Sequence, residues 1–592
     1  MILRPSADAR RRRAPIGPRR RGSVSGARPA ATHGRAARPV SRQRRGRAIG
    51  RASARAIHAH AVWFALGLGA LHLALAAAAF LPTPHTGGDN AAYIALARSL
   101  LERHAYLSLY DPATPPHTQY PPLFPAVLAL AMATGFGAWV QLKWLIALFS
   151  ATATAFTFLW IRRRGRPVLA VGVALLLALS PSVLDQSHWV LSDVPFWCLT
   201  ALALWGFERL SPAIRPRFAI AALAAVAAYF TRSAGLPLML AVLAWLALRR
   251  RWNQLIIVAA VLLPLALLWY LRARNQGGVD YVGQFWYVDP YAPELGRIDV
   301  AGFFGRMTEN AGNYVRVHLP ILLIGASPPA ALAASIAVLL LATLGWARRI
   351  TRPGVAELLL PLYLGLLLAW PAVWSGERFL LPAMPLLLFY AGDALIAGIE
   401  RLRPRAGLLA GTVVVAIVAV AAMPAVADAV RIGSYCRSLY RAGDPYPCLG
   451  AEWRDFFDTA KMAERVLPED AVVLSRKPRL FYGLSGLRGR NYPMSPEPSV
   501  FFAAAADAGA RYVVLDRLGR QAQAYLLPVL FRRPNAFCLM HATRATATAL
   551  LGILPGAADL ADATAEERLS GQFSLCGDEY WRSPDLRESV VR

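Results

Sequence analysis

The sequence is poor in charge and almost free of lysine. Only 17% of its 592 residues are charged, lysine occurs at three positions, and 56% of the residues are hydrophobic, with a mean hydropathy of +0.39. A soluble protein of this length carries more charge. Several apolar runs approach the roughly 20 residues that a helix needs to cross a bilayer. The composition excludes a soluble enzyme and predicts an α-helical polytopic membrane protein.

Cysteine is also scarce, and no two cysteines form a CxxC pair, which disfavours a structural zinc site. Cys198 stands alone in an apolar run, whereas the other four lie in the last third of the chain. An even set in an oxidising compartment predicts two disulfides. Three pairings are possible, and we favour Cys436–Cys448 with Cys538–Cys576 because each closes the shorter loop.

The N-terminal segment is strongly basic. Residues 1–57 contain seventeen arginines and one acidic residue, with few large apolar side chains. This composition predicts a disordered tail. A cytoplasmic positive-inside signal is favoured over a nucleic-acid arm, so no nucleic-acid partner is expected. An upstream start codon is a further explanation for part of the tail. A signal peptide is not expected, because the first apolar run lies far from the start.

Arginine clusters alternate with the apolar runs. Placing each cluster in the cytoplasm satisfies the positive-inside rule, puts the N-terminus inside and leaves about eleven crossings. The clusters are 162–166, 209–217, 249–251, 348–352 and 401–405. The predicted transmembrane segments are 60–82, 140–161, 167–185, 194–210, 218–231, 234–248, 254–271, 330–347, 355–374, 379–397 and 406–427.

This topology divides the chain into a transmembrane domain, residues 58–427, and a C-terminal domain, residues 428–592. The transmembrane domain has an outer-face loop at 83–138, in which 121–135 is too short and proline-rich for a span and predicts a half-embedded helix. After residue 427 the apolar runs shorten to strand length between helical patterns, which predicts a small α/β domain. We expect it to lie in the periplasm. The preference for arginine over lysine and the abundance of alanine indicate a GC-rich bacterial genome, so the expected membrane is a bacterial inner membrane.

The most basic stretch of the C-terminal domain is SRKPRLFYGLSGLRG, residues 475–489. A solvated loop is the favoured interpretation, and the alternative is that Arg476 or Lys477 reaches the membrane surface. The domain as a whole is expected to be structural or to face an acceptor rather than to be catalytic.

Polar residues gather on the predicted outer face. Two carboxylates and two arginines at one membrane surface indicate a site for an anionic, lipid-linked ligand together with a group to be deprotonated. In GGDNAAYIALARSL the acid and the tyrosine share one helical face. The candidates are Asp89, Tyr93, Tyr120, His188, Asp193, Arg232, Glu377 and Arg378.

Five of these residues also have a plainer interpretation. The two aspartates can be helix N-caps, the arginines can reach to phospholipid headgroups, and His188 can be an ordinary membrane-interface residue. Arginines on the outer face, however, run against the positive-inside rule. This exception favours a functional role for Arg232 and Arg378.

Five stretches between residues 60 and 395 resemble, in order and placement, the GT-C superfamily of integral-membrane glycosyltransferases. They are GGDNAAYIALARSL, QYPPLFPAVLALAMATGFG, LSDVPFWCL, YFTRSAGLPLML and ERFLLPAMPLL. The resemblance is to the branch of lipid A aminoarabinose transferases and protein O-mannosyltransferases. It implies a polyprenyl-phosphate-linked sugar donor at the outer face, with Asp89 as the base for the acceptor hydroxyl. It also implies that Arg232 contacts the donor phosphate and that Asp193 is a second acid in the cavity. The implied reaction is a single displacement of the phosphate by the acceptor hydroxyl, which inverts the anomeric centre.

The chain departs from the aminoarabinose transferases at two points. Their arginine three residues after the acid is Ala92 here, and their Glu-Lys-Pro is Tyr120, Pro121 and Pro122. Phosphate binding therefore rests on Arg232 and Arg378. A divalent metal is possible, and no other cofactor is implied. The sugar stays open, and the acceptor can be a glycolipid, a polysaccharide or a protein.

Two other classes of protein compete with this hypothesis. A transporter or flippase of lipid-linked sugars would often show internal repeats and polar residues near the bilayer midplane. No repeat is evident, and the polar residues lie at one surface. A membrane-anchored sensor would leave the outer-face acids and arginines unexplained.

The topology can be tested with a reporter. We expect a reporter that is active only in the periplasm, fused after Arg592, to give signal, because every arginine cluster is then cytoplasmic. A cytoplasmic result would contradict the outer-face site.

Overall fold

The structure is a computed structural model that describes residues 56–57, 59–211, 213–276, 281–403, 406–564 and 573–591. The predicted disordered tail, residues 1–57, lies outside the described residues except for its last two.

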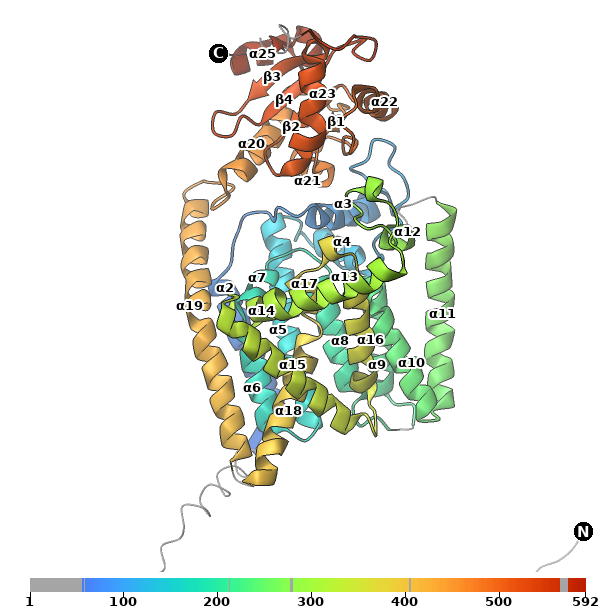
Figure 1. Cartoon of the computed structure of the whole chain (residues 1–592), viewed down its shortest axis with the longest axis vertical. Helices are drawn as coiled ribbons and strands as arrows, with labels where there is room; N and C mark the ends of the chain where they lie inside the picture. Colours follow the sequence, from blue (N-terminus) through green and yellow to red (C-terminus); the bar gives the residue numbers. More distant parts are fainter. Residues whose placement is uncertain are drawn as a thin grey trace, which may run out of the picture. The chain divides into compact units, whose positions relative to one another are not determined.

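Apolar helices make up most of the described chain (Figure 1). Five are long and apolar enough to cross a membrane: α2 (Ala61–Ala78), α5 (Trp139–Arg163), α11 (Trp252–Asn275), α15 (Pro329–Arg349) and α19 (Gly407–Arg441). The other six predicted segments coincide with shorter or more polar helices: α6 (Pro167–Ala178), α8 (Asp193–Phe207), α9 (Pro216–Thr231), α10 (Leu236–Leu248), α16 (Val355–Ala369) and α18 (Met384–Leu402). The protein is a multi-pass membrane protein with a small soluble domain.

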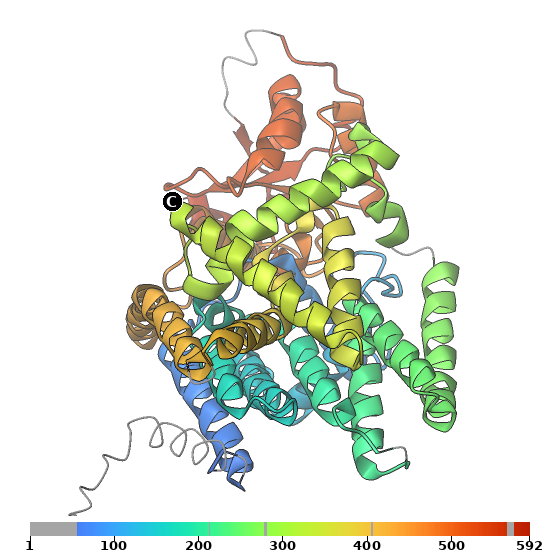
Figure 2. The same ribbon diagram turned by 60° about the horizontal axis from the view of Figure 1, so that its bottom comes forward.

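Close helix contacts build the bundle. Helix α5 packs against α2, α6 and α8, and it buries Trp160 in the core. Helices α15 and α18 touch at Gly345, where an added Cβ would collide with the carbonyl oxygen of Tyr390. Small residues allow such approach between membrane helices. Helix α11 stands at the edge of the bundle in both views (Figures 1 and 2), and few of its residues are buried.

Short elements cover the predicted outer end of the bundle. Helix α4 has eleven residues, too few to cross a bilayer, in agreement with the expected juxtamembrane helix. Helix α13 lies across the upright helices (Figure 1). The elements are α3 (Gly88–Glu102), α4 (Leu123–Ala133), α7 (Pro181–Gln186), α12 (Tyr281–Phe285), α13 (Val300–Asn313), a π-helical turn (Tyr314–His318), α14 (Leu319–Ile324) and α17 (Glu377–Leu380).

Helix α19 connects the bundle to the C-terminal domain. The predicted boundary at 427/428 falls inside this helix, because the apolar run ends there while the helical backbone continues to Arg441. The disulfide Cys436–Cys448 joins the end of α19 to the loop that follows it, and Cys538–Cys576 joins one strand to the residue directly after another. This is the pairing favoured from loop length. Cys198 is free and buried in α8.

The C-terminal domain contains a five-stranded sheet in the order β1-β2-β4-β3-β5. The pairs β1–β2 and β3–β5 are parallel, while β2–β4 and β3–β4 are antiparallel. Its core includes Phe456, Phe481 and Tyr512. The strands are β1 (Val473–Leu474), β2 (Tyr512–Leu515), β3 (Phe537–Ala542), β4 (Ala549–Ile553) and β5 (Ser574–Leu575); the helices are α20 (Ala451–Val466), α21 (Pro478–Ser485), α22 (Pro498–Ala508), α23 (Leu527–Arg532) and α25 (Pro584–Val591).

Helix α21 docks the C-terminal domain on α3 of the membrane domain (Figure 1). The contact is close: a Cβ added at Gly483 would lie 3.1 Å from the Cβ of Ala91 and 3.5 Å from the Trp139 ring. The glycine lets two helices from distant parts of the sequence meet directly. This contact brings the C-terminal domain to the predicted outer-face site.

Candidate functional site

Asp89 lies in the first turn of α3, where three side chains from other segments surround its carboxylate. The Tyr120 hydroxyl donates a hydrogen bond to Oδ1 at 2.7 Å. The guanidinium of Arg378 lies 3.6 Å from Oδ2, and that of Arg479 lies 3.5 Å from Oδ1. The carboxylate remains 39% exposed. A carboxylate with two cations and an open side can receive a ligand.

Helix capping does not account for either aspartate. Gly87 is the N-cap residue of α3, and Ser192 is that of α8. The carboxylates of Asp89 and Asp193 contact side chains instead. The N-cap interpretation is therefore wrong for both.

The surroundings of Asp89 keep it ionised. Burial raises the pKa of its carboxyl group, but Arg378, Arg479 and the Tyr120 hydrogen bond outweigh burial, so the pKa lies below its ordinary value. At neutral pH the group is an anion that can accept a proton.

A second ion pair lies beside the first. Arg232, directly after α9, is 2.8 Å from Asp193 and donates to the Ser192 hydroxyl at 3.2 Å. That hydroxyl is 2.9 Å from the hydroxyl of the buried Tyr93, whose ring packs on Tyr120 with centroids 4.7 Å apart. Tyr93 therefore connects the two ion pairs through packing and hydrogen bonds.

The ring of Phe379 lies next to both site arginines. The guanidinium carbon of Arg232 is 5.0 Å from the ring centroid and that of Arg378 is 4.6 Å from it. The Tyr363 hydroxyl donates to the carbonyl of Phe379 at 2.9 Å and fixes this segment. Two cations held at one aromatic ring can share one anionic group.

Two other predicted pocket residues lie less centrally. Glu377 lies 3.4 Å from Nδ1 of His318, and this contact is the main cause that lowers the pKa of the Glu377 carboxyl. His188 is buried, and its Nε2 donates to the carbonyl of Ala76 at 2.8 Å while its ring meets Phe80 edge-on. The contacts of His188 are with the end of α2, so the structure does not bring it to the carboxylates.

Arg479 is the site residue that the sequence did not single out. Its guanidinium donates to the Tyr120 hydroxyl at 2.7 Å and to Oε1 of Gln119 at 2.9 Å, and it lies over the Tyr110 ring. The solvated-loop interpretation of 475–489 is wrong, because residues 478–485 form α21. The contact with the membrane-surface site that was considered for Arg476 or Lys477 is made by Arg479. No local sequence pattern reveals that Arg479 lies on the face of α21 that docks on α3.

His85 was also missed. Its Nδ1 accepts hydrogen bonds from the backbone of Gly87 at 2.8 Å and from the Asn90 amide at 3.1 Å, and its ring lies on Trp189. Burial, followed by Lys143 and Arg378, lowers the pKa of His85 to about 3. The neutral imidazole shapes the turn that leads into Asp89.

Among the residues that the structure describes, no group of three or more His, Cys, Asp or Glu side chains is arranged to hold a metal ion.

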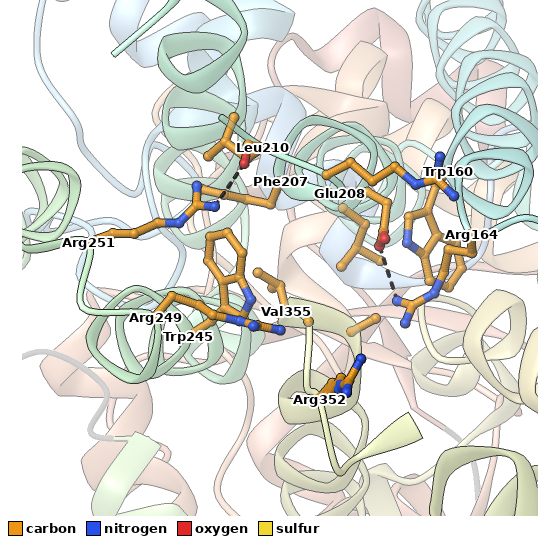
Figure 3. A pocket seen from close by; sticks show the side chains of 14 residues that line it. Trp160, Arg164, Phe207, Glu208, Leu210, Trp245, Arg249, Arg251, Arg352 and Val355 are labelled. Carbon is orange, nitrogen blue, oxygen red and sulfur yellow. Dashed lines mark hydrogen bonds and ion pairs between the residues drawn. The ribbon is translucent and has the colours of Figure 1, made fainter. Parts of the chain in front are cut away.

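An arginine-rich cavity of about 250 Å³ lies at the opposite end of the bundle (Figure 3). Arg164 pairs there with Glu208 at 3.2 Å, and Arg251 donates to the carbonyl of Leu210 at 2.8 Å. Helix α8 separates Glu208 from Asp193 by about 22 Å at 1.5 Å per residue. The cavity lies at the predicted cytoplasmic ends of the helices and is not part of the Asp89 site.

The fold is similar to that of solved GT-C membrane glycosyltransferases. The structure of ArnT from Cupriavidus metallidurans bound to undecaprenyl phosphate matches with a TM-score of 0.50 and 15% identity, over 83% of this chain and 98% of that one. The oligosaccharyltransferase from Archaeoglobus fulgidus in complex with zinc and sulfate matches with a TM-score of 0.49 and 14% identity, over 81% and 72%. No family model and no curated protein matches the chain.

The lowered pKa of Asp89 predicts a pH-dependent contribution to stability. A depressed pKa in the folded state stabilises the fold above the ordinary value of about 3.9, and this contribution is lost as the pH falls through the folded-state pKa. We expect Asp89→Asn to lower the free energy of unfolding at pH 7 by less than about 1 kcal/mol, because solvent screens the exposed carboxylate. Thermal unfolding should show this difference shrinking below about pH 4; a constant difference down to pH 3 would contradict the ion-pair assignment.

Proposed function

We propose that this protein is an inverting glycosyltransferase that moves a sugar from a polyprenyl-phosphate-linked donor to an acceptor hydroxyl at the periplasmic face of a bacterial inner membrane. The observation that carries the proposal is the ionised Asp89 carboxylate, half-exposed beside two arginines. The GT-C fold supports the reaction class, and the undecaprenyl phosphate bound by ArnT supports the donor class.

In this proposal Arg232 and Arg378 bind the donor phosphate. They are the two cations at the Phe379 ring, and Arg479 is already engaged with Tyr120 and Gln119. As the bond between the anomeric carbon and the phosphate oxygen breaks, the leaving polyprenyl phosphate gains negative charge. Guanidinium groups held in place stabilise that charge more than the ground state.

Asp89 acts as the general base. Its carboxylate takes the proton of the acceptor hydroxyl while that oxygen attacks the anomeric carbon from the side opposite the phosphate, which inverts the centre. In the structure Arg378 pairs with Asp89. A donor phosphate competes for Arg378, which weakens one of the contacts that lower the pKa of Asp89. Donor binding would thus make the carboxylate a stronger base.

Tyr120 and Arg479 act as positioning residues. Tyr120 donates to Asp89 and accepts from Arg479, so the hydroxyl lies between the base and the C-terminal domain. This arrangement fixes one carboxylate oxygen and leaves the other near Arg378. The C-terminal domain is therefore required for the geometry of the base.

Asp89→Asn tests the base directly. Asparagine keeps the shape and accepts a hydrogen bond but cannot take the proton, so we expect sugar transfer to fall at least about 10²-fold in the purified, folded protein. Asp111→Asn is the matched control, because Asp111 lies in the same outer loop and also pairs with an arginine of the C-terminal domain, Arg490. Near-normal transfer by Asp89→Asn would remove Asp89 as the base. Movement of the donor across the bilayer without transfer would favour the flippase.

Arg232→Gln and Arg378→Gln test donor binding. A charge-assisted hydrogen bond contributes roughly 1.5–3 kcal/mol, so each variant should lower kcat/KM for the polyprenyl-phosphate donor about 10- to 100-fold. Arg316→Gln is the control, since Arg316 is an exposed arginine in the same predicted outer region. Unchanged donor kinetics in both site variants would show that these arginines do not bind the phosphate.

A further inference from the structure

A cavity of about 250 Å³ lies between the C-terminal domain and the segment that follows α11. The membrane domain contributes Tyr291, and the C-terminal domain contributes the rest. Tyr525 lies 3.5 Å from Glu294 and links the two sides. The lining residues are Tyr291, Arg476, Lys477, Asn491, Tyr492, Met494, Gln521 and Tyr525.

The lining has the chemistry of a saccharide site. Three tyrosines offer flat apolar faces together with hydroxyl groups, and two carboxamides can both donate and accept hydrogen bonds. Apart from Met494 every lining side chain carries a polar group. A sugar ring has C–H faces for the aromatic rings and hydroxyl groups for the amides, whereas an acyl chain would leave these polar groups without partners.

The two cations of the lining favour a ligand with negative charge. Arg476 donates through Nε to Oε1 of Gln521 at 2.8 Å, while its Nη1 is buried without a hydrogen-bond partner among the described residues. The buried hydroxyl of Tyr492 also has none. Burial lowers the pKa of Lys477, and the buried Asp516 lies within electrostatic range of both cations. Asp89 and Arg479 also lie within electrostatic range of Lys477, so three cations face two carboxylates. The net charge is positive, and an anion would satisfy the donors.

The cavity is adjacent to the base. Arg476 and Lys477 directly precede Pro478, the first residue of α21, and Arg479 on that helix is 3.5 Å from Asp89. Lys477 itself is within electrostatic range of Asp89. A ligand bound at Lys477 therefore lies on the side of Asp89 that faces the C-terminal domain. Arg232 and Arg378, by contrast, belong to the membrane domain.

We infer that this cavity binds the acceptor and that the acceptor is a saccharide with a phosphate or carboxylate group. The inference rests on the proposed function. The anionic group lies at Arg476 and Lys477, the sugar ring packs on the tyrosines, and a hydroxyl reaches Asp89. The separate locations keep the charges of donor and acceptor apart, since each has its own pair of cations.

Saturation-transfer NMR on the full-length protein in detergent tests this site. The probes are glucose 6-phosphate, glucuronic acid, glucose and inorganic phosphate. We expect both acidic sugars to bind more tightly than glucose or phosphate. Arg476→Gln and Lys477→Gln should each weaken the acidic sugars by about 10-fold or more and leave glucose unchanged. Arg465→Gln, an exposed arginine of α20 that does not line the cavity, should change nothing.

Several outcomes would overturn the inference. Equal binding of glucose and glucose 6-phosphate would show that the cavity does not recognise an anionic group. Inorganic phosphate binding as tightly as the sugar phosphate would show that it does not recognise the sugar. Binding of the acidic sugars that is unchanged in both Arg476→Gln and Lys477→Gln would show that they do not bind in this cavity. Asp89→Asn should still bind glucose 6-phosphate, so a failure of the cavity and a failure of the proposed base are seen in different measurements.

Discussion

The site depends on one carboxylate, that of Asp89, which side chains from three other segments contact. Asp89 comes from the loop after the first membrane helix, Tyr120 from the end of that loop, Arg378 from the start of α17 and Arg479 from the C-terminal domain. Each contact alone would contribute little on an exposed surface. Together they fix the docking of α21 on α3, lower the pKa of the carboxyl group and place two cations at one edge of the bundle. The functional proposal and the acceptor cavity both follow from this arrangement.

The opposite end of the bundle uses its arginines differently. Buried carboxylates there pair with arginines of two predicted cytoplasmic clusters: Glu357 with Arg164, and Asp393 with Arg166 and Arg349. Burying a charge is costly unless it is paired, so these arginines join the turn between α5 and α6 and the end of α15 to α16 and α18. At the Asp89 end the carboxylate that lies between two arginines is itself 39% exposed. Ion pairs and an accessible carboxylate therefore meet at one point there.

Much of the fold could be predicted from the sequence because hydropathy and arginine spacing are local signals. All eleven predicted segments coincide with helices, and the short strands and both disulfides of the C-terminal domain follow the expected pattern. The local sequence also placed Asp89, Asp193, Arg232 and Arg378 at helix ends on one side. It could not show that Arg479 reaches Asp89 or that His188 turns into the bundle, because both depend on docking between segments far apart in the chain. The boundary at 427/428 was missed for another reason: α19 continues after its apolar composition ends.

We propose that the donor phosphate binds at Arg232 and Arg378, at the edge of the bundle that faces the C-terminal domain. The most direct test is a structure of the full-length protein with undecaprenyl phosphate bound. We expect phosphate oxygens within hydrogen-bond distance of both guanidinium groups, beside the Phe379 ring, with Arg378 farther from Asp89 than in the present structure. A phosphate bound instead in the arginine-rich cavity at the opposite end, with the Arg378–Asp89 pair intact, would contradict it.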